Sequence, residues 1–252
     1  MFFLRGQNWR IKGDFGKAIE DFTKAIELNP NLVEAYILRG MAFRNKGDLD
    51  KAIADYSEAI RLDPQSSETH ICRGIAYAKK DELDKALADY TKALALDPKS
   101  AEAFFCRGVV YRNKGDLEKA IADYSEVLKL DPTFANAYSG RGIVYANKDE
   151  PDKAIADYTK ALEICPKDGV VYHVRGMSYE KKGEDDKALS DYSQAIALAP
   201  QYAPTYVTRA FLLFKHKDCD KAWADVKKYQ ELGGKVDPGL LKKLREASGR
   251  NE

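Results

Sequence analysis

The sequence of 252 residues has no apolar run near the roughly 20 residues needed to span a bilayer. Its start, MFFLRGQNWR, reaches charged residues too soon to contain the apolar core of a signal peptide. A net charge is also nearly absent, because 41 basic side chains are balanced by 40 acidic ones. This balance gives no electrostatic surface for nucleic acid or anionic lipid. We therefore expect a cytoplasmic protein with no nucleic-acid partner and no membrane partner.

Cysteine is sparse, and catalytic motifs are missing. The four cysteines, Cys72, Cys106, Cys165 and Cys219, form no CxxC pair, so free thiols are expected. A disulfide or metal pair between Cys72 and Cys106 is the less favoured alternative. The sequence lacks GxGxxG, GxxxxGK[ST], HExxH, GxSxG and any Cys/His cluster with metal-ligand spacing. The sequence thus predicts no enzyme active site, no cofactor and no metal.

A repeat of 34 residues is what the chain does contain. Arg-Gly recurs at this spacing from Arg5-Gly6 to Arg175-Gly176, and Arg209-Ala210 continues the register. An aspartate recurs without a gap, at Asp21, Asp55, Asp89, Asp123, Asp157, Asp191 and Asp225. The seven repeats run over about 1–32, 33–66, 67–100, 101–134, 135–168, 169–202 and 203–236.

Each repeat predicts two helices. In the second repeat, the first helix runs over about 34–46 and ends at Gly47, because glycine tolerates the left-handed conformation there. Asp48 is the expected N-cap of the second helix, which should end near Leu62, two residues before Pro64. Small residues such as Gly40 fall where the two helices must approach closely.

This pattern resembles the tetratricopeptide repeat family, which has small residues at repeat positions 8, 20 and 27, aromatic residues at 4, 11 and 24, and proline at 32. Counted from Val33, the second repeat supplies Tyr36, Gly40, Phe43, Ala52, Tyr56, Ala59 and Pro64. The resemblance covers about residues 1–236. It implies an all-α, right-handed superhelical solenoid of antiparallel helix pairs.

The chain departs from the family at repeat position 7, where arginine replaces the usual leucine in all seven repeats. A half-buried arginine needs a partner, because an unpaired buried charge is costly. We predict that each arginine pairs with the recurring aspartate, as in Arg39 with Asp55 or with the aspartate of a neighbouring repeat. A ladder of arginines that binds phosphates is the alternative.

The two ends differ. Asp237-Pro238 predicts a helix start, and Leu240, Leu241 and Leu244 share one apolar face, so residues 237–252 are interpreted as a C-terminal capping helix and tail. No such cap precedes the first repeat. Two alternatives follow from this bare end: the chain is a regulatory or targeting domain of a larger enzyme, or copies of it stack through the N-terminal repeat.

The resemblance implies a binding groove lined by positions 2, 5, 9, 12 and 13 of each first helix. Positions 5 and 9 are mostly apolar here, and positions 12 and 13 are basic or amide. The expected partner-binding residues are Ile37, Met41, Arg44, Ile71, Ile75, Lys79, Phe105, Val109, Arg112, Asn113, Ile143, Asn147, His173, Met177, Val207 and Phe211. Packing between neighbouring first helices is the alternative role of any one apolar member.

The sequence therefore favours a non-catalytic scaffold that binds a partner peptide or helix through apolar anchors with charged edges. Phe105, Met177 and Phe211 are the expected anchors, since aromatic and long apolar side chains dominate interface energetics. The family's site for chaperone C-terminal tails has lysine at position 5 and asparagine at position 9. Ile37 and Met41 stand there instead, so binding of that kind is not expected.

Overall fold

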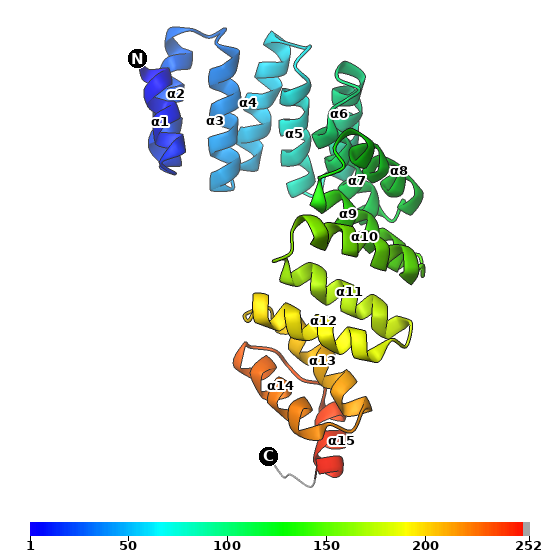
Figure 1. Cartoon of the computed structure of the whole chain (residues 1–252). Coiled ribbons are helices and arrows are strands. Elements are labelled where there is room, and N and C mark those ends of the chain that lie inside the picture. Colours follow the sequence, from blue (N-terminus) through cyan, green and yellow to red (C-terminus); the bar gives the residue numbers. More distant parts are fainter. Residues whose placement is uncertain (249–252) are drawn as a thin grey trace. The chain divides into compact units, whose positions relative to one another are not determined.

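The computed structural model describes residues 1–248, apart from the side chain of Leu240, and these residues form fifteen helices and no strand (Figure 1). The chain divides into two compact units, Met1–Pro132 and a second unit that begins at Thr133. The all-α class and the pairing of successive helices are confirmed.

The first unit contains eight helices, drawn from blue to green in Figure 1. They are α1 (Phe2–Ile11), α2 (Phe15–Leu28), α3 (Val33–Lys46), α4 (Leu49–Leu62), α5 (Ser67–Lys79), α6 (Leu83–Leu96), α7 (Ala101–Lys114) and α8 (Leu117–Leu130). Each odd-numbered helix packs against the even-numbered helix that follows it, and also contacts the next odd-numbered helix. The odd-numbered helices thus form one continuous layer within the unit.

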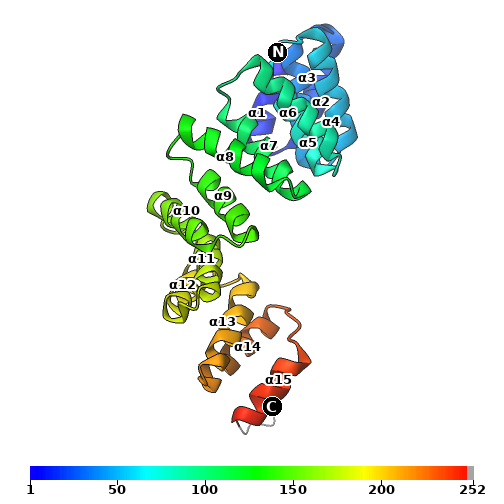
Figure 2. The same ribbon diagram turned by 90° about the vertical axis from the view of Figure 1, so that its right-hand side faces the viewer.

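The second unit repeats the pairing of each odd-numbered helix with the even-numbered helix that follows it, and it adds one helix. It contains α9 (Ala135–Asn147), α10 (Pro151–Ile164), α11 (Gly169–Lys181), α12 (Asp185–Leu198), α13 (Ala203–Lys215), α14 (Cys219–Glu231) and α15 (Pro238–Ser248). Figure 2 shows α15 beside α14. Leu244 of α15 is fully buried against Ala222 and Val226, and Trp223 Nε1 donates a hydrogen bond to Ser248 Oγ at 2.9 Å. Helix α15 therefore covers apolar surface of α14; residues 249–252 of the expected tail lie outside the described residues.

The helix boundaries follow the local sequence signals. Gly47 ends α3 with a φ of 88°, as expected for a left-handed C-terminal residue. The equivalent turn of the third repeat holds Asp81 in the same conformation, with a φ of 62°. Asp48 is at the expected N-cap of α4, but its side chain makes no capping hydrogen bond and lies 3.8 Å from Lys51 Nζ instead.

The glycine of each Arg-Gly pair allows an aromatic ring to pack directly on the first helix. A Cβ atom added to Gly40 would lie 2.8 Å from a ring carbon of Tyr56, and one added to Gly142 would lie 2.7 Å from a ring carbon of Tyr158. The seventh repeat has alanine in place of this glycine and Val226 in place of the tyrosine. A larger residue on one helix thus accompanies a smaller residue on the other.

All seven position-7 arginines make the predicted pair, and each does so within its own repeat. In each pair the arginine Nε and Nη2 atoms donate to the two carboxylate oxygens of the aspartate, over distances of 2.7–2.9 Å. This two-bond geometry is the one that suits a planar guanidinium best. The arginines therefore join the two helices of each repeat and are not free for phosphate.

These arginines also join neighbouring repeats. Nη1 of Arg39 donates to the Thr23 hydroxyl at 3.0 Å, and Nη1 of Arg73 donates to the Ser57 hydroxyl at 3.1 Å. Arg107, Arg175 and Arg209 make the equivalent bond at 3.4, 3.2 and 3.0 Å. Each bond reaches the second helix of the preceding repeat, so the guanidinium connects three helices at once.

We expect Arg39→Met to lower the free energy of unfolding by about 3–5 kcal/mol, because Asp55 would stay buried without its cation. The carboxylate has little access to water, since the Asp55 side chain is 7% exposed. Removing the second charge as well, in Arg39→Met/Asp55→Ala, should recover part of this loss. Urea unfolding followed by circular dichroism measures both changes.

The matched control for this experiment is Arg61→Met, which breaks the exposed Arg61–Glu58 pair on α4. An exposed pair of this kind contributes about 0–1 kcal/mol. If Arg39→Met costs no more than this control, the pair does not hold the two helices together.

Candidate functional site

The expected partner-binding residues all lie on the first helix of a repeat. They are distributed over α3, α5 and α7 in the first unit and over α9, α11 and α13 in the second. Successive odd-numbered helices contact each other from α1 to α7 in the first unit, and α9 contacts α11 in the second. We call the surface of the odd-numbered helices that carries these residues the first-helix face of each unit. How much of each side chain reaches solvent differs strongly along that face.

Two of the expected residues are buried and present little surface to a partner. Ile71 is 4% exposed and packs in the core around Tyr90. His173 is 5% exposed, with its ring centroid 5.8 Å from that of Tyr192 and 5.4 Å from that of Tyr202. Burial lowers the pKa of His173, so the ring is neutral near pH 7. Ile71 and His173 thus form the floor of the face.

Three further members are partly taken up by packing. Ile37 and Met41 of α3 contact the core around Cys72 and Ala76 of α5, as the packing alternative requires. Phe105 is half-buried, with its ring 5.8 Å from that of Tyr124. Phe105 is therefore a less accessible anchor than the sequence suggests.

Met177 and Phe211 are the apolar members that reach solvent most clearly. They occupy equivalent positions on α11 and α13, and they are 49% and 46% exposed. Large side chains of this kind normally lie inside a protein, and exposed apolar patches with polar rims mark interaction sites. The second unit thus displays two of the three expected anchors.

A hollow of about 250 Å³ opens next to Met177, between α9 and α11. Its apolar walls come from Ile143, Val174 and Met177, and its polar rim includes Asn147 and Lys181. The expected residues Ile143, Asn147 and Met177 therefore line one cavity. The hollow is smaller than the roughly 300–1,000 Å³ of small-molecule pockets and suits a single side chain.

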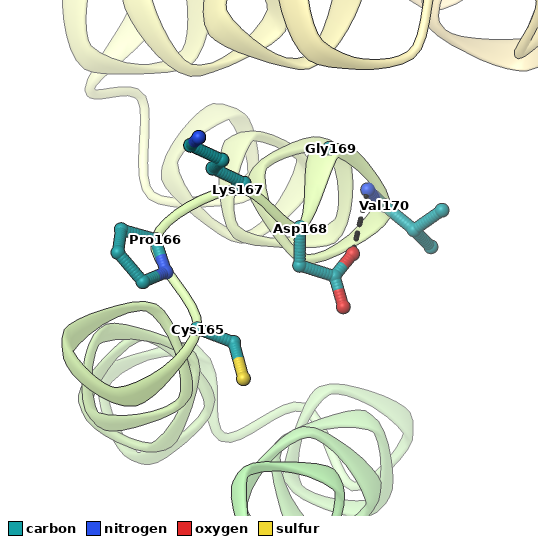
Figure 3. A pocket seen from close by; sticks show the side chains of 6 residues that line it. All are labelled: Cys165, Pro166, Lys167, Asp168, Gly169 and Val170. Carbon is teal, nitrogen blue, oxygen red and sulfur yellow. Dashed lines mark hydrogen bonds between the residues drawn. The ribbon is translucent and has the colours of Figure 1, made fainter.

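A wider depression lies at the loop between α10 and α11 and is lined by residues 165–170 (Figure 3). The Asp168 carboxylate accepts hydrogen bonds from the backbone N–H groups of Val170 and Val171, at 3.0 and 3.1 Å, and so caps α11. Figure 3 shows Lys167 directed away from this carboxylate. All six lining residues come from one continuous segment, and their polar groups do not converge on a common point.

The cysteines and carboxylates of the described residues form no chemical centre. All four cysteines are free, and His70 lies in the core, with Nδ1 3.1 Å from Asp89 Oδ1. Within residues 1–248, no group of three or more His, Cys, Asp or Glu side chains is arranged to hold a metal ion. The same range contains no helix that is both long enough and apolar enough to cross a membrane.

Models of the tetratricopeptide repeat match the chain over residues 2–32, 22–54, 40–81, 76–114, 110–149, 135–168 and 170–202. These matches cover well over half of the sequence, so the chain belongs to the tetratricopeptide repeat family. No curated protein matches it.

Several solved structures are similar to the chain. The crystal structure of MamA is 33% identical over 64% of this chain and 95% of that chain, with a TM-score of 0.60. A tetratricopeptide repeat protein from Parabacteroides merdae is 22% identical over 99% and 98% of the two chains, with a TM-score of 0.74. YrrB, described as a protein of this family with an unusual peptide-binding site, is 24% identical over 78% and 97%, with a TM-score of 0.60. The last two likenesses are evidence of the fold alone.

The cysteines give a pH-dependent prediction. Burial raises the pKa of the Cys72 thiol to about 11 and that of the Cys106 thiol to about 12. Because the reactive thiolate forms only as the pH rises through the pKa, both thiols should react slowly at pH 8, and the rates should rise about tenfold per pH unit. The exposed thiol of Cys165 should react first.

Thiol labelling followed by peptide mass spectrometry resolves the sites. Cys165→Ser is the control variant and should remove the fast phase. Labelling of Cys72 at the rate of Cys165 at pH 8 would contradict the burial of Cys72.

Proposed function

We propose that the protein is a non-catalytic scaffold that binds a peptide or helix of a partner protein on the first-helix faces of its two units. The observation that carries this proposal is the exposure of Met177 and Phe211 at equivalent positions of α11 and α13, together with the hollow of about 250 Å³ that Met177 lines. YrrB, a structure of the same fold, is described as having a peptide-binding site, and we propose the same class of ligand for this chain.

In the second unit, one apolar side chain of the partner would enter the hollow between Ile143, Val174 and Met177. Burying an apolar side chain contributes about 1.5–3 kcal/mol. Asn147 at the rim offers an amide group to the partner backbone. Lys181 Nζ is paired with Asp149 at 2.6 Å and would bind a partner carboxylate only by exchanging this one. Phe211 on α13 would offer the partner a second exposed apolar side chain.

We expect Met177→Glu/Phe211→Glu to weaken peptide binding at least tenfold, because each substitution puts a charge where an apolar group of the partner is desolvated. The ligands are peptides selected from a displayed random library with the parent protein, and fluorescence anisotropy of the labelled peptides gives the dissociation constants.

The matched control is Ile164→Glu/Leu198→Glu, which adds the same charge at exposed apolar positions of the second helices α10 and α12. This control should bind as the parent does. Equal losses in both variants, or equal retention in both, would remove the first-helix face as the site.

A second candidate function, self-association through α1 and α2, is favoured by one observation. Leu4 and Ile11 of α1 and Leu28 of α2 are exposed apolar side chains. A second copy of the chain would cover them by stacking on this surface.

We expect the parent to show a concentration-dependent increase in mass by light scattering, and Leu4→Glu/Ile11→Glu to abolish it. Both chains should keep the same helical circular dichroism. A parent that stays monomeric at millimolar concentration would exclude this candidate, and the Ile164→Glu/Leu198→Glu variant is again the control for added charge.

A further inference from the structure

The first unit carries a second set of arginines that differs from the position-7 set. Arg10, Arg44 and Arg112 share repeat position 12, at the C-terminal ends of α1, α3 and α7. All three side chains are half-buried. Within the described chain none of them pairs with a carboxylate: Arg112 contacts the amide oxygen of Asn113 at 3.4 Å, and Arg10 Nε is buried without a hydrogen-bond partner. These guanidinium groups therefore make no ion pair within the described chain, although the carboxylates of Glu68 and Glu102 act on the Cys72 thiol together with Arg44.

Two tyrosine hydroxyls beside these arginines are also without a partner. Tyr56 and Tyr124 are fully buried, and their hydroxyl oxygens accept and donate no hydrogen bond within the described chain. Burial raises the pKa of Tyr124 to about 12, and the nearby charge of Arg112 opposes that rise; Arg44 acts in the same way on Tyr56. No hydrogen bond joins either phenol to its arginine, although a phenolic hydroxyl can accept a hydrogen bond as well as donate one.

The sixth repeat shows which group can bind to the hydroxyl of the tyrosine at position 24. There position 12 is Glu180, and its carboxylate accepts a hydrogen bond of 2.7 Å from the hydroxyl of Tyr192, the equivalent of Tyr56 and Tyr124. In the fifth repeat position 12 is Ala146, and the hollow beside Tyr158 opens instead. A carboxylate can therefore bind to the hydroxyl of the tyrosine at position 24. In the second and fourth repeats, position 12 holds an arginine instead of this glutamate.

From this combination of unpaired arginines and unpaired phenols we infer that the first-helix face of the first unit binds an acidic peptide segment. Carboxylates of its Asp or Glu side chains are held in two-bond contacts by Arg44 and Arg112, with the hydroxyls of Tyr56 and Tyr124 as additional donors once the flexible arginines shift toward the ligand. Arg10 provides a third contact on the neighbouring helix. This inference deepens the proposed function and rests on it for the choice of face, but it concerns the other unit.

The helix spacing suggests the arrangement of the acidic residues. Packed helix axes lie about 8–10 Å apart, and a polyproline II segment advances about 9.3 Å in each turn of three residues. Acidic residues at i, i+3 and i+9 of such a segment lie on one side and match the successive places of Arg10, Arg44 and Arg112. Position 12 of the intervening helix α5 is Ala78, which accounts for the gap at i+6.

The test measures binding of a fluorescein-labelled, proline-rich peptide with Glu at i, i+3 and i+9 to the full chain by anisotropy. The matched ligand has Gln at the same three positions. We expect the Glu peptide to bind at least tenfold more tightly than the Gln peptide, with an affinity that falls as salt rises. Equal binding of the two peptides, or no binding of either, overturns the inference.

Three variants locate the contact. Arg44→Gln/Arg112→Gln should lose at least tenfold in affinity for the Glu peptide. Lys46→Gln/Lys114→Gln removes the same two charges two residues further along the same helices, and it should stay within threefold of the parent. Tyr56→Phe/Tyr124→Phe should weaken binding about threefold or more while leaving thermal stability unchanged, because these hydroxyls have no internal partner. If the arginine and lysine variants lose the same affinity for the Glu peptide, the net charge of the protein alone explains binding, and the inference is overturned.

The two proposals fail separately. Met177→Glu/Phe211→Glu lies in the second unit and should leave binding of the Glu peptide intact. If the Glu peptide does not bind but library-selected peptides still require Met177 and Phe211, the inference about acidic ligands falls and the scaffold function stands. If the Glu peptide alone binds, and does so through Arg44 and Arg112, the apolar site of the second unit falls.

Discussion

The bidentate contact between arginine and aspartate is the constraint on which each repeat depends. A buried charge pair contributes little net stability compared with a well-packed apolar pair, but removing one partner is costly. Leucine, the usual residue of the family at this position, would bury comparable apolar surface without requiring a particular partner. Arg39, in contrast, has only one place where Nε and Nη2 both reach a carboxylate. We infer that the pair fixes the relative height of the two helices.

The third bond of the guanidinium extends this constraint along the chain. Arg39 also donates to Thr23, so a shift of one repeat against the next would break a hydrogen bond to a charged group. The ring centroids of Tyr36 and Phe43 lie 5.7 and 6.0 Å from the Arg39 guanidinium carbon, so both rings pack against this group. Positions 4, 7 and 11 of the first helix are thereby committed to packing. The contacts of positions 9 and 12 differ from repeat to repeat: Met41 packs on the core around Cys72, whereas Met177 is exposed. The candidate sites lie at these variable positions and at position 13.

Much of this arrangement follows from the sequence because the spacing repeats. The helix limits near Gly47 and Leu62 and the pairing of Arg39 with Asp55 require only the 34-residue register and the cost of an unpaired charge. The bond to Thr23 is less evident, although a hydroxyl residue recurs at the same place as Ser57 and Thr91. Its recognition requires knowing that the second helix of one repeat faces the guanidinium of the next.

The exposure of individual groove residues does not follow from the register. Ile71 and Ile37 share repeat position 5, yet one is buried and the other half-buried. Met41 and Met177 share position 9 and differ in the same way: Met41 packs on the core around Cys72, whereas Met177 stands at the edge of a hollow. The size and shape of the side chains on the adjoining helix decide how exposed each groove residue is. A sequence pattern that treats each position alone does not describe contacts between residues of two helices.

The same freedom gives the two units different chemistry on one scaffold. At position 12 the first unit has arginine three times, while the second has Ala146, Glu180 and Phe214. In the fifth repeat a hollow opens beside Ala146 and Tyr158, and in the sixth the Glu180 carboxylate accepts a hydrogen bond from the Tyr192 hydroxyl. The residue at position 12 thus changes the surroundings of the ring at position 24 in these repeats. Because the Arg–Asp pair and the position-8 glycine already hold the helices, such changes need not disturb the fold. A repeat of this kind can therefore acquire a binding preference one position at a time.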